Sequence, residues 1–384
     1  MSKTSFRSGS PAPRHLSWYV RPAARTWTCA PPPADVRDFH AGLPGYSPTA
    51  LTELPVLASE LGVGRVFVKD ESSRLGLPAF KALGASWAIH RVLTQRADRG
   101  GGPVRLVTAT DGNHGRAVAR MARLFGQRAQ VFVPRGVHPA AVTAIEDEGA
   151  DVVLVPGAYD EAVRRAADAA SGGQDSVLVQ DTAWPGYERI PAWIVEGYST
   201  LFAETDEQLR AVGVEAPGLV VVPAGVGSLG QAAVAHYRSR RTESPPAALM
   251  SVEPDTAACV LAGLGRGEPV SVPTGATTMA GLNCGTVSSL AWPYLRDGLD
   301  AAVAVTDADS GVAARDLAAA GVSSGPCGAA SLAGARAALT GDGAAVRRSA
   351  LDVGPASTVV LLSTEGVAAN PHLDANPHAD EDSR

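Results

Sequence analysis

The stretch VFVKDESSRLGLPAFKALGASWAIH, residues 66–90, indicates both a fold and a reactive group. It begins as a buried β-strand, continues through a loop rich in Gly, Pro and Ser, and opens a helix at Phe80-Lys81. A lysine in the first turn of a helix lies near the positive end of the helix dipole, which disfavours its ammonium form. Lys81 is therefore a candidate for a neutral amine that forms a Schiff base. An isolated Phe-Lys pair is more often a solvated surface feature, so the surrounding segments have to support this interpretation.

Strand-like and helix-like segments alternate beyond this stretch, which predicts βαβ units and parallel sheets. The first series contains strands at 104–110, 129–136, 151–157 and 176–182, with helices at 115–126, 140–150 and 159–171 between them. A long amphipathic helix is expected near 191–211. The second series contains strands at 218–225, 248–254 and 357–364. Their nearly continuous apolar runs are typical of strands that are covered on both faces.

We therefore predict an α/β protein of two lobes, each an open, mostly parallel sheet covered by helices. Residues 1–45 are expected to form a partly disordered N-terminal extension, and residues 371–384 a disordered tail. The larger domain is expected to comprise 46–85 and 200–370, and the smaller one 86–199.

Composition narrows the class of protein further. The 384 residues are 45% hydrophobic and carry a formal net charge of −6, which argues against nucleic acid as the main partner. We find no apolar run long enough to cross a membrane and no signal-peptide pattern, so a cytoplasmic protein is expected. The four cysteines contain no CxxC motif, which predicts neither a metal site nor a redox dithiol.

A second segment with chemical potential is TATDGNHGRAVA, residues 108–119. A strand ends in a Gly-containing turn that leads directly into a helix, and backbone N–H groups in such a turn bind anions such as a carboxylate. Asn113 could donate to a phenolate oxygen, and Asp111 could act as a base or bind an amine. The structural alternative is an ordinary Asp-Gly turn that caps the helix.

The third segment is VVVPAGVGSLGQAAVA, residues 220–235, which has the strand, Gly-rich loop and helix of a phosphate-binding site. No Gly-Lys-Ser/Thr follows, so it is not a Walker A loop. The spacing of Gly225, Gly227 and Gly230 fits the glycines of a dinucleotide fingerprint, and an NAD-binding oxidoreductase stays as a remote alternative.

Together with LLSTEG at 361–366, these segments resemble the tryptophan-synthase-β-like family of fold type II pyridoxal-phosphate (PLP) enzymes. Within that family, the runs KDES, TDGNHGR, QDTAW, AGVG, VEPD and STEG are similar to those of the diaminopropionate ammonia-lyases. The resemblance spans roughly residues 40–366 and implies a homodimer.

The resemblance also implies roles for individual residues. Lys81 would hold PLP as a Schiff base and move the α-proton, and Asp111 could take that proton from the opposite face. The implied catalytic residues are Lys81, Asp111 and Asp181. The implied substrate-binding residues are Thr110, Asp111, Gly112, His114 and Asp181. The implied cofactor-binding residues are Phe80, Lys81, Asn113, Gly225, Val226, Gly227, Ser228, Leu229, Gly230, Ser363 and Thr364.

The implied reaction is α,β-elimination of ammonia from 2,3-diaminopropionate, which gives pyruvate and two ammonia through an aminoacrylate. Two alternatives keep PLP: a dehydratase or β-replacement enzyme acting on serine, threonine or another β-substituted alanine, and a non-catalytic amino-acid binder. The run 321–331 reads Ser323-Ser324 where the lyases have Glu-Ser, which predicts the loss of an acidic group near the cofactor. Cys259 and Cys284 are expected to be neighbours, either reduced or paired.

Overall fold

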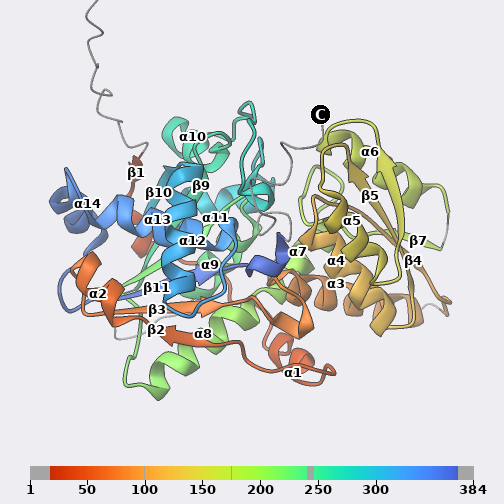
Figure 1. Ribbon diagram of the computed structural model, residues 1–384. Helices are drawn as coiled ribbons and strands as arrows, with labels where there is room; N and C mark the ends of the chain where they lie inside the picture. The colour runs from red at the N-terminus through yellow and green to blue at the C-terminus, as the bar shows by residue number, and fades with distance from the viewer. Residues whose placement is uncertain (1–17, 99, 174, 240–245, 371–384) are drawn as a thin grey trace, which may run out of the picture.

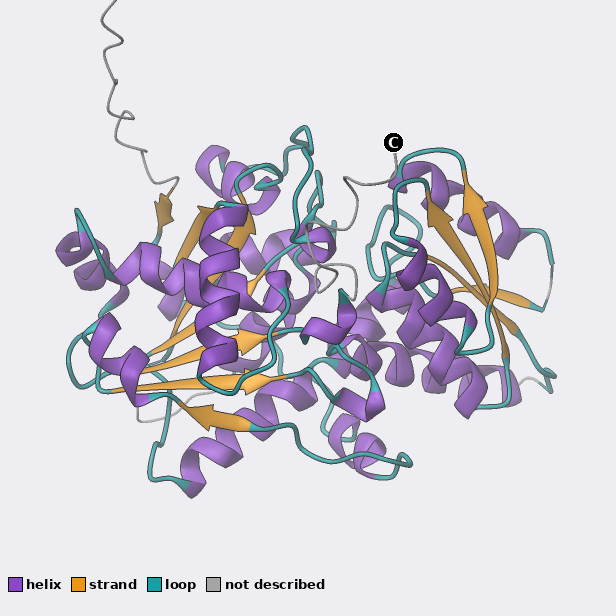
Figure 2. Cartoon of the chain, in the orientation of Figure 1, coloured by secondary structure: helices purple, strands orange, loops and turns teal. Residues whose placement is uncertain are grey.

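The computed structural model describes residues 18–98, 100–173, 175–239 and 246–370, and it contains two sheets covered by helices (Figures 1 and 2). The predicted disordered tail, 371–384, lies outside the described residues. The α/β class with mostly parallel sheets is confirmed, whereas the domain boundaries stay a prediction. The strands of the larger sheet, from one edge to the other, are β1 (Trp18–Val20), β10 (Ala301–Val305), β9 (Ala248–Pro254), β8 (Leu219–Pro223), β11 (Thr358–Ser363), β3 (Arg65–Asp70) and β2 (Leu51–Glu53).

The two edge strands of the larger sheet are antiparallel to their neighbours, and its inner strands are parallel. One of these edges is β1, from the part of the chain expected to be an extension, which pairs with β10. The smaller sheet is wholly parallel, in the order β6 (Asp151–Val155), β5 (Arg128–Pro134), β4 (Arg105–Ala109) and β7 (Ser176–Leu178).

Helices cover both faces of each sheet. They are α1 (Val36–Ala41), α2 (Pro55–Leu61), α3 (Lys81–Ala97), α4 (Asn113–Leu124), α5 (Pro139–Glu146), α6 (Tyr159–Ser171), α7 (Arg189–Gly197), α8 (Ser199–Ala211), α9 (Ser228–Arg238), α10 (Cys259–Arg266), α11 (Ala291–Gly298), α12 (Asp307–Ala319), α13 (Pro326–Leu339) and α14 (Ala344–Leu351). None of the helices in the described part of the chain has the length and hydrophobicity that a membrane span requires.

Strand β8 shows why the apolar runs are continuous. Its five residues are all buried. Leu219 and Val221 belong to the core cluster that also contains α13, whereas Val220 and Val222 belong to the cluster that contains α9. Because successive side chains of a strand point to opposite faces, a strand between two helical layers needs an apolar residue at every position.

The helix expected near 191–211 is two helices, α7 and α8, which meet at Tyr198. The expectation of one long helix is therefore wrong, and the reason is a tertiary contact. A Cβ atom on Gly197 would lie 2.5 Å from the backbone oxygen of Leu83 and 2.8 Å from Cα of Gly84 in α3. The α7–α8 junction is thus packed directly onto the backbone of the helix that begins with Lys81.

Gly197→Ala is expected to lower the free energy of unfolding by about 1–3 kcal/mol, because the new methyl group has to push two backbones apart. Urea or thermal denaturation measures this loss. The matched control is Gly265→Ala in α10, where nothing lies within 4 Å of the added Cβ and alanine favours the helix. Equal changes in the two variants would contradict the close packing of α3 and α7.

A buried ionic cluster holds the loop between β3 and α3. Glu204 of α8 accepts hydrogen bonds from Lys69 Nζ at 2.7 Å and from Arg74 Nη1 at 2.7 Å, and Glu71 pairs with Arg74 at 2.7 Å. These four side chains have no exposed surface. The KDES run is thus explained by structure, because its charged residues fix the loop that leads to Lys81.

Candidate active site

The three chemically suggestive segments converge at the carboxyl ends of parallel strands. Each passes from a strand through a loop into a helix: β3 to α3, β4 to α4 and β8 to α9. A pocket with about 980 Å³ of empty space lies between them. Of the residues expected in the site, those that line this pocket are Phe80, Lys81, Thr110, Asp111, Gly112, Asn113, His114, Asp181, Gly225, Val226, Gly227, Ser228, Leu229 and Thr364.

Two expected site residues lie behind the pocket wall. Gly230 is in the first turn of α9, where an added Cβ would be 2.9 Å from Leu295. Ser363 ends β11 fully buried, and its Oγ donates to Ser324 Oγ at 2.8 Å. Ser324 belongs to the run 321–331, so this run lies beside Ser363, which the family resemblance implies would face the pyridine nitrogen of PLP.

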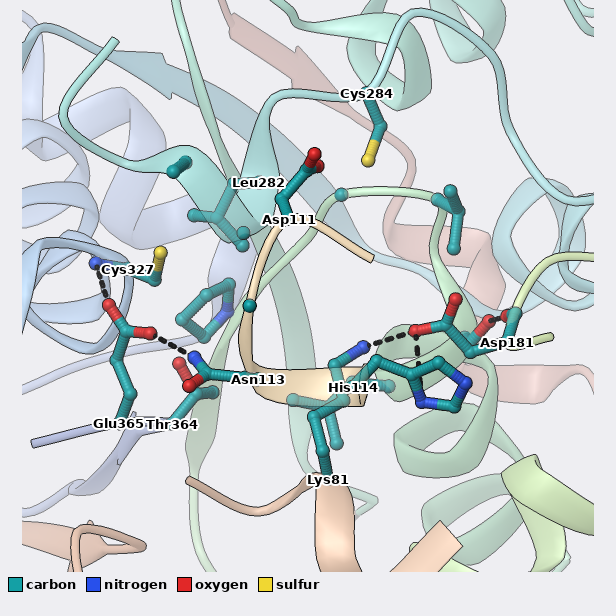
Figure 3. A pocket seen from close by; sticks show the side chains of 18 of the residues that line it. Lys81, Asp111, Asn113, His114, Asp181, Leu282, Cys284, Cys327, Thr364 and Glu365 are labelled. Carbon is teal, nitrogen blue, oxygen red and sulfur yellow. Dashed lines mark hydrogen bonds and ion pairs between the residues drawn. The ribbon is translucent and has the colours of Figure 1, made fainter. Parts of the chain in front are cut away.

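Lys81 is the first residue of α3, and its Nζ lies 2.6 Å from Asp181 Oδ2 (Figure 3). Burial alone would lower the pKa of Lys81, but the Asp181 carboxylate raises that pKa above its ordinary value. The expectation of a depressed pKa is therefore wrong here, because a carboxylate 100 positions along the chain outweighs the helix dipole. Burial opposes ionisation of Asp181, but His114 and Lys81 keep the pKa of Asp181 below its ordinary value.

Asp111 lies across the pocket from Lys81, beside the thiol of Cys284 (Figure 3). Burial, reinforced by the negative charge of Asp181, raises the pKa of Asp111 to about 7. Two carboxylates of the same pocket are thus held in different states near neutral pH. Asp181 is ionised, and Asp111 can both accept and release a proton.

His114 follows Asn113 in α4 and contacts the neighbouring strand segment. Its Nε2 lies 2.8 Å from the carbonyl oxygen of Val179, so Nε2 carries a hydrogen. Burial lowers the pKa of His114, and its Nδ1 lies 3.8 Å from Asp181 Oδ2.

The Gly-rich loop at the start of α9 has the features of an anion site. Among the described residues, the backbone N–H groups of Gly225, Gly227 and Ser228 have no hydrogen-bond partner. Gly227 has φ of +93°, which only glycine adopts readily. The free N–H groups and the helix dipole together suit a phosphate.

Sequence reasoning missed several residues that line the pocket. Among them are Tyr159, Glu365 and Asn370. The predicted loss of an acidic group at Ser323 stays a prediction, and a separate acidic residue, Glu365, is in hydrogen-bond contact with Asn113. The sequence did contain a signal for Glu365, because this residue belongs to the STEG run that is similar to the lyases.

The four cysteines are free thiols. Cys259 and Cys284 both lie beside Gly225: Cys259 Sγ is 3.7 Å from the Gly225 oxygen, and Cys284 Sγ is 3.0 Å from where a Gly225 Cβ would be. Burial raises the pKa of both thiols. No cluster of side chains suited to a metal ion occurs within the ranges that the structure describes.

Comparisons with known proteins agree with this geometry. A family model described as pyridoxal-phosphate dependent enzyme matches residues 43–364. Diaminopropionate ammonia-lyase of Salmonella typhimurium is 37% identical over 294 residues, which cover 71% of this chain and 72% of the relative. A crystal structure of diaminopropionate ammonia-lyase from Escherichia coli in complex with an aminoacrylate-PLP azomethine reaction intermediate gives a TM-score of 0.84 and 32% identity, and covers 93% of this chain and 96% of that chain. The structure of that enzyme in complex with D-serine gives a TM-score of 0.84 and 31% identity, with the same coverage.

Proposed function

Because the chain belongs to the pyridoxal-phosphate dependent enzymes, we propose that it eliminates ammonia from 2,3-diaminopropionate, with PLP attached to Lys81. The products are pyruvate and two ammonia. The observation that carries the proposal is a pocket in which one lysine lies between two carboxylates of different acidity, Asp181 and Asp111. The similarity to diaminopropionate ammonia-lyases supports the choice of substrate. We extend the proposal to a homodimer, as the family resemblance implies, and keep the cytoplasmic location predicted from the sequence.

The residues of the pocket fit PLP. Lys81 supplies the amine, and the free N–H groups of Gly225, Gly227 and Ser228 at the start of α9 suit the phosphate. Asn113 offers an amide to the 3′-oxygen. Thr364, which follows β11 and lines the pocket, offers a neutral hydroxyl group, whereas Ser363 lies behind it with its hydroxyl group donated to Ser324. When bound, PLP supplies an electron sink for a carbanion at the α-carbon.

The residues around this position can perform the proton transfers of an elimination. Asp181 accepts a hydrogen bond from Lys81 Nζ and so fixes the direction in which the lysine points. Lys81 can take or return a proton at the α-carbon from its side of the pocket. Asp111 can take a proton from the other side when ionised. It can also pair with the second ammonium group of the substrate, which a monoamino acid lacks.

The family assignment gives no support to the NAD-binding alternative for the loop 225–230. A PLP-dependent dehydratase or β-replacement enzyme stays as a second candidate. The observation behind it is the run 321–331, whose Ser324 contacts Ser363 beside the expected pyridine nitrogen.

The proposal is tested by offering purified, PLP-loaded protein D- and L-2,3-diaminopropionate in parallel with L-serine, L-threonine and O-acetyl-L-serine. Two ammonia per pyruvate from diaminopropionate is the expected result, because both amino groups leave the carbon skeleton. Lactate dehydrogenase coupling measures the pyruvate, and glutamate dehydrogenase coupling measures the ammonia. Turnover of the hydroxyl or acetoxy substrates without turnover of diaminopropionate would assign the second candidate instead.

A further inference from the structure

The carboxylate of Glu365 lies directly behind Asn113 in the pocket wall (Figure 3). Its Oε2 accepts a hydrogen bond from Asn113 Nδ2 at 2.6 Å, and its Oε1 accepts one from Asn370 Nδ2 at 2.8 Å. The backbone N–H of Cys327 donates to the same Oε1 at 3.2 Å. Only 3% of Glu365 is exposed, so these donors replace the water that a surface carboxylate would have.

The place of Glu365 in the fold surrounds its carboxylate with hydrogen-bond donors. Cys327 is in the first turn of α13, a helix of 14 residues, and an anion at a helix N-terminus is stabilised by the dipole. The other partners are two side-chain amides, so the negative charge is held by donors rather than neutralised by a cation. Hydrogen bonds to an ionised acceptor are short and strong, as the 2.6 Å contact with Asn113 is.

The orientation of the Asn113 amide follows from this contact. An ionised carboxylate can only accept, so the nitrogen of the amide has to face Glu365 and its oxygen has to point away. One N–H of Asn113 is then used by Glu365, and the second is held at a fixed angle to it. A free asparagine at the start of a helix could turn its amide either way.

We propose that Glu365 is a positioning residue, which fixes the Asn113 amide so that its second N–H is held ready for the 3′-oxygen of PLP. The inference rests on the proposed attachment of PLP to Lys81 and not on the identity of the amino-acid substrate. Glu365 also brings a negative charge close to the 3′-oxygen. That charge favours retention of a proton between this oxygen and the Lys81 nitrogen.

Glu365→Gln separates this role from a structural one. The glutamine oxygen can still accept from Asn370 and from the Cys327 N–H, so the fold around α13 keeps its hydrogen bonds. The glutamine NH₂ then faces Asn113, whose amide has to turn over to accept from it, and the N–H meant for the cofactor is lost. We expect a melting temperature close to that of the wild type, but PLP affinity reduced about tenfold, which is the loss of roughly one charge-assisted hydrogen bond.

Titration of the visible absorbance band of the PLP-loaded protein against pH gives a second readout. In Glu365→Gln, the pH at which the band of the protonated form is lost should shift, because both the nearby negative charge and the Asn113 donor to the 3′-oxygen are removed. The Cys327 thiol contacts Glu365 itself. Lys81 interacts electrostatically with five other titratable groups: Asp111, His114, Asp181, Tyr198 and Cys284. They are the same in both proteins, so the difference between the two titrations reports on Glu365.

A double-mutant cycle tests whether Glu365 acts through Asn113. If it does, Glu365→Gln should weaken PLP binding in the wild type but add little in an Asn113→Ala background. Additive losses, or unchanged PLP affinity in Glu365→Gln, would overturn the inference. Glu253→Gln is the matched control: Glu253 also accepts backbone N–H groups at a helix start, those of Val260 and Leu261 at 2.8 Å each, and it does not line the pocket.

The outcome also distinguishes this inference from the proposed function. Wild-type protein that takes up no PLP and gives no visible band would refute the attachment to Lys81. If the wild-type protein binds PLP, and Glu365→Gln shows the same band and the same PLP affinity as the wild type, only the role of Glu365 is refuted.

Discussion

Replacement of Lys81 by alanine is expected to reduce the elimination of ammonia about 10³-fold or more, because it removes the amine that lies beside Asp181 and is proposed to hold the cofactor. The first measurement is the coupled pyruvate assay. The second is the visible absorbance of protein mixed with PLP, which should lack the borohydride-sensitive band that a lysine Schiff base gives. Loss of both establishes that Lys81 is the attachment point.

A matched control for this variant is Lys69→Met. Lys69 is fully buried in the ionic cluster with Glu204, so its loss should affect stability more than the absorbance band. A Lys81→Ala protein that keeps the borohydride-sensitive band would contradict the assignment, since the cofactor would then be attached elsewhere. Added propylamine or another small amine, which can occupy the vacated volume, should restore part of the rate.

Asp111→Asn is expected to reduce turnover of D-diaminopropionate by about 10²–10³-fold, and turnover of the L-isomer by less than about tenfold. Lys81 and Asp111 lie on opposite sides of the pocket (Figure 3). If the α-carbon lies between them, each group would reach a proton on a different face. Measuring kcat/KM for both isomers checks the difference, and equal losses would show that Asp111 serves binding rather than proton transfer.

The pH dependence gives an internal check on the same variant. Burial and Asp181 raise the pKa of Asp111 to about 7, so its basic form accumulates as the pH rises through that value. The wild-type rate with the D-isomer should therefore increase between about pH 6 and pH 8, and this limb should vanish in Asp111→Asn. Asp181→Asn is the comparison variant. Asp181 stays ionised across this pH range, so it does not itself produce a change in rate between about pH 6 and pH 8.

Local patterns were sufficient to predict the strand–loop–helix units that build the pocket. Phe80-Lys81, the Gly112-Asn113 turn and the loop at 225–230 are each contained in a short segment whose glycines and dipoles act locally. The same applies to β8, whose apolar residues at successive positions indicate burial on both faces. Strand β10 was missed, because its sequence AAVAV is rich in alanine, which favours helices.

The remaining features depend on contacts between distant parts of the chain. The break at Tyr198 is caused by α3, more than 100 positions earlier, and the charge of Lys81 is decided by Asp181. The Asn113–Glu365 contact joins residues 252 positions apart. A single sequence shows the types of these residues but not that they meet, so the acidic neighbour of Asn113 had to come from the structure.

The order of the strands in the larger sheet has a consequence for synthesis on the ribosome. The smaller sheet uses only residues 105–178 and can form as soon as that segment has emerged. The larger sheet cannot, because its inner strand β11 separates β3 from β8 and is the last strand of the described chain. Until β11 is inserted, the facing edges of β3 and β8 lack partners and are open to pairing with other chains. Ser363, Thr364 and Glu365 lie at the end of that strand, so this part of the pocket wall emerges from the ribosome after the three strand–loop–helix segments of the pocket.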